Sequence, residues 1–295
     1  MEHLQSTSWN VYRYVGDYLH DAAVAVLCAQ ILCSRSVAGL SRRSQQLYLT
    51  LFCSRYLDLL FGPQTFYLVV HKLFFISGTA ATLLLFAVWR GTYEAEKDTC
   101  SVLAIALPAF LAAAWMAEEA SGVEVMWTFS VYLEGFAMVP QYVFSYRDHG
   151  SFRLGVVTYI VLMGLYRTFY VLNWMHKKAR LPFYSDVHSW AGGAANVGFF
   201  LDYVLFHAMG ISCLRRVTLG LDDGVRRAEG ELRQRFGACL LAPGNGGHLS
   251  IDPGVEVMPT RGSLSSGRPA VPEAPGLIGA SSLGAGSGAE TSAGV

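Results

Sequence analysis

Apolar runs of about 20 residues follow one another along the chain up to residue 210, and this pattern restricts the possible folds more than any other feature. A single helical crossing of the hydrocarbon core of a bilayer needs about this length, because a helix rises about 1.5 Å per residue. Charged residues make up 15% of the chain, whereas an ordinary soluble domain contains about 25%. The sequence therefore predicts an all-α membrane protein.

Seven candidate spans can be placed in these runs, at about residues 14–33, 45–62, 66–89, 100–118, 123–144, 154–175 and 183–209. Basic residues gather in the first, third and fifth connections and after the last span. The positive-inside rule then predicts a luminal N-terminus and a cytosolic C-terminus. The sixth connection, with Lys177, Lys178 and Arg180, is basic on the opposite side and is the exception.

A Pro-Gln pair, Pro140-Gln141, stands near the end of the fifth candidate span. Proline removes a backbone hydrogen bond from a helix, so the pair predicts a kink. The second candidate span likewise opens with polar residues around Gln45. One such helix in each half of a seven-helix chain fits two three-helix repeats plus a linker helix, the SWEET/PQ-loop-like fold that we expect.

The composition changes after about residue 217. Residues 222–236 are charged and predict a short cytosolic helix, whereas residues 242–295 are rich in glycine, serine, alanine and proline. A segment without apolar periodicity cannot form a core and is expected to be disordered. We therefore predict a seven-helix membrane domain at 1–217 and a cytosolic, largely disordered Gly/Ser-rich tail at 218–295.

Several function classes are excluded by the sequence. The formal net charge is zero, so no nucleic-acid partner is expected. The six cysteines are scattered without a metal-ligand spacing, and no catalytic motif such as HExxH or GxSxG occurs. We therefore expect neither a bound metal nor an enzyme.

Ionisable residues inside the spans point to a binding site, because an arginine at the centre of a membrane helix costs roughly 2.5–3.5 kcal/mol. Arg13, Arg55 and Arg167 can line one cavity, and the arginine fork binds carboxylates with two hydrogen bonds. Acids such as Asp58 and Glu124 suit a cation. The pattern favours a ligand with several carboxylates and a positive charge. In the alternative, these groups pair only among themselves and fix the helix register.

Residues 166–174 carry the most informative helical face. Arg167, Tyr170 and Trp174 recur at spacings that place them on one side of a helix, which predicts a polar cavity inside a bundle. The alternative is an interfacial belt, in which arginine and aromatic side chains reach the lipid headgroups.

Six unusual strings spread over most of the apolar region carry a family resemblance. They read RYVGDYLH (13–20), SRSVAGLSRRSQ (34–45), RYLDLL (55–60), TYEAEKDT (92–99), EVMWTFSVYLEGFAMVPQ (124–141) and YRTFYVLNW (166–174). From about Tyr12 to Tyr203 the chain resembles the KDEL receptor family, the ER lumen protein-retaining receptors. The resemblance implies a pH-dependent receptor that binds the C-terminal KDEL- or HDEL-type signal of escaped ER luminal proteins in the Golgi and returns them to the ER.

The resemblance also implies partners and a location. Protons act as the effector and no cofactor is expected. The partners are the C-terminal tetrapeptide, vesicle coat machinery on the cytosolic side and membrane lipid. The location is the ER and Golgi membranes. A SWEET/PQ-loop-like transporter of a small zwitterionic or sugar-like solute is the alternative, because the same charged groups suit such a ligand.

Two sets of site residues follow from the resemblance. The set for signal binding contains Arg13, Arg55, Tyr56, Asp58, Glu124, Trp127, Arg167, Tyr170, Asn173, Trp174 and Lys177. The set for pH sensing and locking contains His20, Glu134 and Tyr166. In the alternative, His20 is a neutral core residue and another group, such as His71, senses pH.

The resemblance also implies individual roles for some residues of the signal-binding set. Arg55, together with Tyr56, takes the terminal carboxylate of the signal. Asp58 and Glu124 take its leading lysine or histidine, against which Trp127 packs.

The chain also departs from the family pattern. Lys177 stands where the family commonly has arginine, which keeps the charge but loses the fork. Asp21 stands beside His20, where the family is usually apolar, so we expect a carboxylate to act on that histidine. No lysine follows Lys178, although the short tail of the family carries a lysine-based sorting signal.

Overall fold

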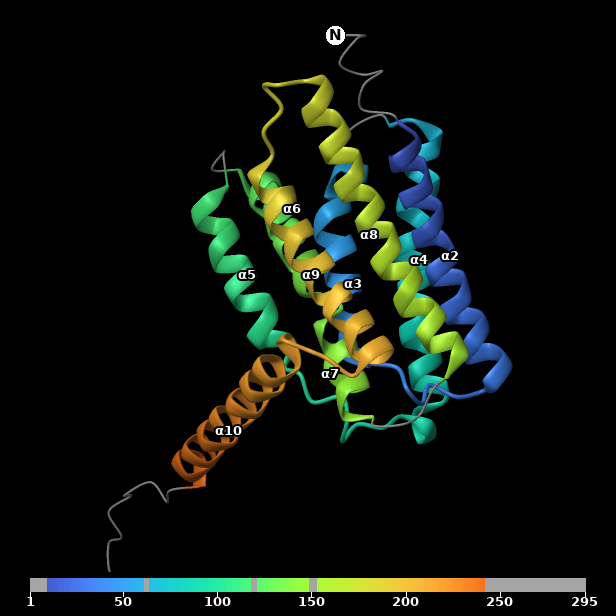
Figure 1. The fold of residues 1–295 in the computed structure, drawn as a ribbon. Helices are drawn as coiled ribbons and strands as arrows, with labels where there is room; N and C mark the ends of the chain where they lie inside the picture. Colours follow the sequence, from blue (N-terminus) through green and yellow to red (C-terminus); the bar gives the residue numbers. More distant parts are fainter. Residues whose placement is uncertain (1–9, 61–63, 118–120, 149–152, 242–295) are drawn as a thin grey trace, which may run out of the picture. The chain divides into compact units, whose positions relative to one another are not determined.

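The computed structural model describes residues 10–60, 64–117, 121–148 and 153–241, and all the secondary structure in these ranges is helical (Figure 1). The α-helices are α2 (Val11–Ser34), α3 (Arg42–Arg55), α4 (Phe66–Val88), α5 (Val102–Met116), α6 (Gly122–Phe136), α7 (Val139–Arg147), α8 (Leu154–Arg180), α9 (Val187–Met209) and α10 (Leu214–Leu241). Short 3-10 turns occupy Tyr56–Leu60 and Arg90–Thr92.

Several helices begin where a short polar side chain caps their first turn. Ser41, Ser101, Ser121 and Asp186 each accept a hydrogen bond from a backbone N–H three residues later. Such caps satisfy one of the four N–H groups that a helix start leaves without a partner. The apolar runs thus form helices whose starts are fixed by serine or aspartate.

Three helices in the described part of the chain, α2, α4 and α8, are long and apolar enough to cross a membrane. α9 qualifies only together with α10, from which it is separated by a bend of 114°, and α5 is apolar but shorter. The protein is therefore an all-helical membrane protein with several spans. Each of the seven predicted segments contains a helix, although its ends differ.

The largest difference lies at the end of α8. We placed Lys177, Lys178 and Arg180 in a connection, but they form the last turns of the helix, where Leu181 N–H donates to Lys177 O at 2.8 Å. Cations are stabilised at a helix C-terminus by the partial negative charge of the free carbonyl groups. The basic character of these residues thus marks the end of a helix.

The helix is interrupted just before the Pro-Gln pair, because α6 ends at Phe136, α7 begins at Val139 and Pro140 lies in the first turn of α7. Gln141 uses the break to contact the chain before α3. Its Oε1 accepts from Ser41 N at 2.8 Å, and its Nε2 donates to Gly39 O at 3.0 Å. Its backbone N–H donates to Ser44 Oγ at 3.0 Å. The kinked helix is therefore fastened to the start of α3.

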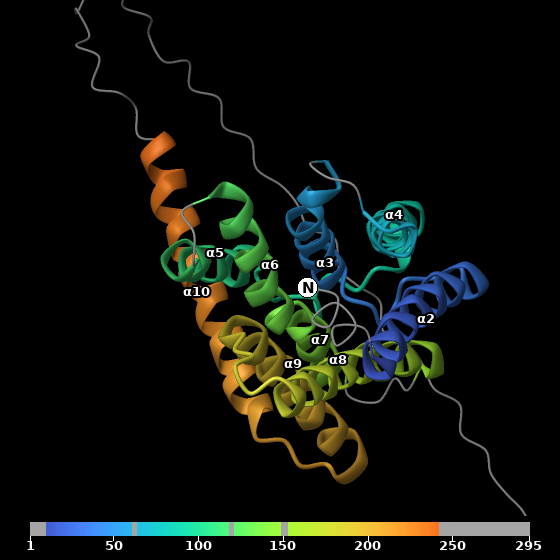
Figure 2. The same cartoon turned by 90° about the horizontal axis from the view of Figure 1, so that it is seen from above.

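The helices pack as a bundle with two groups, which are best seen along the bundle axis (Figure 2). α2 packs against α8 and α4, while α6 packs against α3, α5 and α9. Apolar side chains at the centre, including Leu27, Leu47, Leu51, Leu133 and Ile160, are almost completely buried. Burial of this kind supplies most of the packing energy of the bundle.

Glycines allow α6 and α9 to approach each other closely. A Cβ atom on Gly192 would lie 2.7 Å from the backbone oxygen of Val131, and one on Gly135 would lie 3.1 Å from the oxygen of Gly192. Small residues are common at such contacts between membrane helices, because they let two backbones meet.

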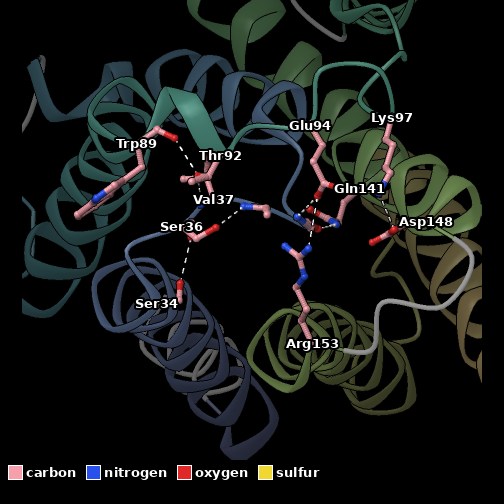
Figure 3. A network of polar contacts seen from close by, with 12 residues as sticks. Ser34, Ser36, Val37, Trp89, Thr92, Glu94, Lys97, Gln141, Asp148 and Arg153 are labelled. Atoms are coloured by element: carbon pink, nitrogen blue, oxygen red, sulfur yellow. Dashed lines mark hydrogen bonds and ion pairs between the residues drawn. The ribbon is translucent and has the colours of Figure 1, made fainter.

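The first, third and fifth connections meet at one end of the bundle (Figure 3). Glu94 accepts from Gly39 N at 2.9 Å and from Lys97 Nζ at 2.5 Å, and it lies 3.7 Å from Arg153. Lys97 also donates to Asp148 at 2.7 Å. The hydrogen bonds to Asp148 and Glu94 raise the pKa of Lys97, so this ammonium stays charged and holds the connections together.

α10 crosses the boundary that we placed between residues 217 and 218. Asp202 of α9 accepts hydrogen bonds from Cys213 N at 2.8 Å and from Leu214 N at 3.0 Å, so the charged segment begins as a helix directly after α9. The division into a membrane domain and a tail stays a prediction. Residues 242–295, for which disorder was expected, lie outside the described residues.

We predict that Gly192→Ala destabilises the protein, because a backbone oxygen cannot rotate away from the new methyl group. Forced overpacking of this kind costs typically about 1–3 kcal/mol. Thermal unfolding in detergent measures the effect. Gly198→Ala on the same helix is the control, since nothing lies within 4 Å of its Cβ position. Equal melting temperatures for the two variants would contradict the close contact of α6 and α9.

Candidate binding pocket

A cavity of about 310 Å³ opens between α2, α3, α4, α6 and α8, at the end of the bundle opposite the connection network. It adjoins a wider hollow of about 660 Å³. Residues on both walls include Arg55, Tyr56, Lys72, Trp127 and Tyr184. We treat the two hollows as one pocket with a narrow inner part and a wide mouth.

The structure brings most of the predicted site residues to this pocket. The inner part is lined by Arg13, Arg55, Tyr56, Trp127, Glu134, Arg167, Tyr170, Asn173, Trp174 and Lys177. The mouth adds Asp58 and Glu124. His20 and Tyr166 line neither part and lie beneath the inner one, where Tyr166 contacts Glu134.

Glu134 forms the floor of the pocket between two arginines. Its Oε2 lies 2.8 Å from Arg55 Nη1 and 2.7 Å from Arg167 Nη1, and its Oε1 accepts from the Tyr166 hydroxyl at 2.6 Å. The side chains of Glu134 and Arg167 are only 4% and 3% exposed. The arginines therefore do pair within the bundle, as the alternative reading of the sequence expected, but one carboxylate serves two cations.

The two arginines keep donors that point to no protein acceptor. Arg55 Nε donates to Ser130 Oγ at 3.0 Å, yet its Nη2 and the Nε of Arg167 have no hydrogen-bond partner among the described residues. Buried donors without a partner are rare and costly. The floor of the pocket therefore carries one net positive charge and donors suited to a carboxylate.

Arg167 does not extend to the membrane surface, because it is buried beneath an aromatic wall. Its guanidinium lies 5.0 Å from the centre of a Trp174 ring, a cation–π contact. Tyr170 packs edge-on against the same ring. A Cβ on Gly193 would lie 2.4 Å from Trp174, so this glycine gives the indole its place. The face of α8 that carries Arg167, Tyr170 and Trp174 thus lines the inner pocket.

A second anion, Asp17, lies in the inner pocket and was missed as a site residue. It accepts hydrogen bonds from the hydroxyls of Tyr67, at 2.9 Å, and Tyr170. Asn10 caps α2 through the backbone N–H of Arg13 and donates to Asn173 Oδ1 at 2.7 Å. These bonds hold the start of α2 against α8. The spacing of four residues between Arg13 and Asp17 was the signal for a polar stripe.

Asp58 at the mouth is engaged by Lys72 of α4. The two side chains are 2.5 Å apart, and Lys72 also donates to Gln64 at 2.7 Å. Among the described residues, the Glu124 carboxylate has a single polar contact, with the Thr128 hydroxyl at 3.5 Å. Sequence reasoning missed Lys72, although a lysine inside an apolar span was itself a signal.

Asp21 does not act on His20 as expected. Neighbouring residues on a helix point about 100° apart, and Asp21 faces α4, where its carboxylate lies 3.0 Å from His71 Nδ1. His20 is buried and stacks between the rings of Phe75, at 4.2 Å, and Tyr166, at 4.3 Å. The expectation was wrong because adjacency in sequence is not contact in a helix.

The connection between α8 and α9 covers one side of the mouth. Lys177 Nζ lies 5.7 Å from the centre of the Tyr184 ring. Lys178 donates to the backbone oxygens of Pro182, at 2.7 Å, and Tyr184, at 2.8 Å. Tyr184 and Asp186 line both parts of the pocket. No periodic pattern marks these two residues, so sequence reasoning did not single them out.

Known proteins similar to this chain decide its family. A family model described as ER lumen protein retaining receptor matches residues 36–177. An ER lumen protein-retaining receptor of Petunia hybrida is 34% identical over 202 residues, 67% of this chain and 93% of the relative. The chain belongs to the ER lumen protein-retaining receptor family.

Other relatives agree. The ER lumen protein-retaining receptor B of Arabidopsis thaliana is 34% identical over 203 residues, 67% of this chain and 93% of the relative. The receptor erd-2.1 of Caenorhabditis elegans is 34% identical over 184 residues, 62% of this chain and 86% of the relative. Membership confirms the resemblance and places the chain among receptors, not enzymes.

We predict that Glu134→Ala strongly destabilises the receptor, because the buried guanidinium of Arg167 and the partly buried one of Arg55 lose their shared counter-charge. Removing one partner of a buried ion pair costs about 3–5 kcal/mol. Thermal unfolding in detergent is the measurement. Glu124→Ala, which removes a pocket carboxylate without an ion pair, is the control and is expected to melt close to the unaltered protein. A Glu134→Ala variant of unchanged stability would show that the ion pairs contribute nothing to the fold.

Proposed function

We propose that this receptor binds the C-terminal KDEL- or HDEL-type signal of escaped ER luminal proteins in the Golgi and returns those proteins to the ER. Membership of the ER lumen protein-retaining receptor family supports the retrieval role. The observation that carries the signal-binding role is the pocket floor, where Arg55 and Arg167 share one carboxylate and keep unpartnered donors. A peptide tail with two acidic residues before its last residue, and with a free terminal carboxylate, suits these donors.

The signal would enter with its C-terminus first. Its terminal carboxylate would reach Arg55 and Tyr56 in the inner pocket, and the preceding acidic side chains would face Arg167 and Arg13. Its leading lysine or histidine would then remain at the mouth, beside Glu124 and Trp127. This order is supported by Arg13 and Arg167, which line the inner part but not the mouth. Asp58 and Glu124 line the mouth but not the inner part.

Asp58 needs a further step before it can take the leading residue. Its carboxylate is bound by Lys72 at 2.5 Å, so the ammonium of the signal has to displace an internal one. Glu124, with its weak 3.5 Å contact, is open to the signal without such an exchange. We therefore assign the first contact to Glu124 and the later contact to Asp58.

A receptor fits the packing beneath the pocket better than a transporter of a small solute. His20, Phe75 and Tyr166 stack on one another directly below Glu134. The next cavity towards the opposite end, which is lined by His20, Tyr48 and other residues, has a volume of about 10 Å³. A space of that size holds about one water molecule, so a solute would not pass through this part of the bundle in this conformation.

We further infer that the chain crosses the membrane seven times, as two three-helix repeats plus a linker helix, with a luminal N-terminus and a cytosolic C-terminus. The first, third and fifth connections lie at one end and carry arginines, which favours the cytosol for that end. The pocket at the other end would then face the lumen. The vesicle coat machinery would meet the connection end, and lipid would surround the apolar helices.

We predict that Arg55→Ala weakens binding of a peptide ending in KDEL roughly 10- to 100-fold, since each lost charge-assisted contact costs about 1.5–3 kcal/mol. Arg55→Lys is expected to be impaired as well, because a point charge cannot reproduce the fork. Fluorescence polarisation with purified full-length protein at mildly acidic pH is the measurement.

The matched control is Arg90→Ala, which removes an exposed arginine at the connection end of the bundle. Its affinity is expected to equal that of the unaltered protein. If Arg55→Ala binds the peptide with unchanged affinity, the carboxylate-clamp hypothesis fails, whatever the control shows.

We also predict that His20→Ala flattens the dependence of affinity on pH between about pH 5.5 and 7.5, the range in which histidine changes charge. His20 stacks on Tyr166, which donates to Glu134, so uptake of a proton by His20 would act on the pocket floor through this contact. A ligand that binds the protonated form more tightly is held at low pH and released as the proton leaves. The charged groups around His20 are Glu134, Arg55, Arg167 and His71.

The same titration on His71→Ala separates the two candidate sensors. His71 contacts Asp21 and lines the inner pocket, so it faces the ligand as well. A full pH dependence in His20→Ala together with a flat one in His71→Ala would assign the sensor to His71 and overturn the prediction.

A further inference from the structure

α10 leaves the bundle at a defined angle. Its axis is bent by 114° from that of α9, and Asp202 fixes the bend through the backbone N–H groups of Cys213 and Leu214. Seen from above, α10 runs across the bundle and not along it (Figure 2). If α9 follows the membrane normal, α10 lies closer to the membrane plane than to the normal.

One face of α10 is docked on the connection end of the bundle. Asp222 is buried and lies 2.8 Å from Arg147 Nη2, and it also accepts from the Thr99 hydroxyl. Two turns further on, Glu229 accepts from Ser101 Oγ at 2.5 Å. Asp223 lies 2.6 Å from the same guanidinium nitrogen of Arg147. Three of the acids of the helix are therefore engaged by the bundle.

A different face of α10 carries an apolar stripe, formed by Val217, Leu221, Ala228 and Leu232. The spacings of four, seven and four residues place them on one side of a helix, about a quarter turn or more from Asp222. Val217, Leu221 and Leu232 are 55%, 65% and 52% exposed. The bundle does not cover this stripe.

Exposed arginines accompany the stripe. They are Arg216, Arg226, Arg227, Arg233 and Arg235. The bundle engages Asp222, Asp223 and Glu229, so the surface that α10 presents outward carries these five arginines against one exposed acid, Glu231, and is basic. A helix with an apolar face and a basic face is the form that lies in the headgroup layer of an anionic bilayer.

We propose that α10 is an interfacial helix whose apolar stripe inserts into the leaflet at the connection end of the bundle and whose arginines bind anionic lipid headgroups. The bend at the end of α9 would place α10 along the membrane surface at which α9 ends. The charge of the exposed surface is complementary to anionic lipid. The proposal does not depend on signal binding at the opposite end.

Limited trypsin digestion of the full-length protein in lipid nanodiscs tests this helix directly, because its arginines are the cleavage sites. We expect cleavage after Arg226 and Arg227 to be at least fivefold slower in phosphatidylcholine with about 30% phosphatidylserine than in phosphatidylcholine alone, since anionic lipid retains basic interfacial helices. Cleavage after the exposed Arg90 in the same sample normalises the effect of lipid on the protease. High salt should abolish the difference.

Two variants with one added charge each complete the test. Leu232→Asp places a carboxylate in the apolar stripe and is expected to remove the protection. Gln234→Asp places the same charge two residues away, off the stripe, and is expected to retain it. Equal melting temperatures of the variants show that the bundle is intact, because both positions are exposed.

The opposing outcomes are distinct. Equal cleavage in both lipids, unaffected by Leu232→Asp, would show that α10 is not held by anionic lipid. Protection that appears only after soluble cytosolic protein is added would make the stripe a protein-docking surface. Either result overturns the proposal, whereas neither bears on peptide binding in the pocket.

Discussion

The arrangement of the pocket depends on one buried carboxylate, that of Glu134, which neutralises half of the charge of Arg55 and Arg167. Without it, two guanidinium groups would stand unpaired in a low-dielectric interior, which is strongly unfavourable. A second carboxylate in contact with the same two arginines would leave the pocket floor without a net positive charge. A single shared acid leaves one positive charge on the pocket floor, and under the function proposed above a peptide carboxylate would neutralise it.

The sequence was informative where a residue type conflicted with its surroundings. Arginines inside apolar helices predicted a buried anionic partner, and proline near a helix end predicted the break before α7. Contacts between helices were harder to predict, because the periodicity of a sequence shows which face of a helix is buried but not which helix packs against it. That is why Asp21 was assigned to His20 instead of His71, and why the link between Lys72 and Asp58 was not foreseen.

The two ends of the bundle are built from different interactions. At the connection end, Gln141 and Glu94 bind backbone N–H and carbonyl groups, so the geometry is fixed by short bonds within the protein. At the pocket end, long side chains face a hollow, and Arg55 Nη2 and Arg167 Nε have no acceptor among the described residues. The rigid end holds the helices in register, while the open end keeps the groups that a ligand engages.

The pairing of Lys72 with Asp58 has a consequence for selectivity against inorganic ions. An unoccupied carboxylate at a luminal mouth would attract Ca²⁺, for which carboxylate oxygen is a preferred ligand. A tethered ammonium competes at an effective concentration in the millimolar range or above, so a free cation gains little by replacing it. A peptide gains more, because its other contacts deeper in the pocket are made at the same time. The internal lysine would thus keep single ions from Asp58, whereas the multipoint ligand proposed above could displace it.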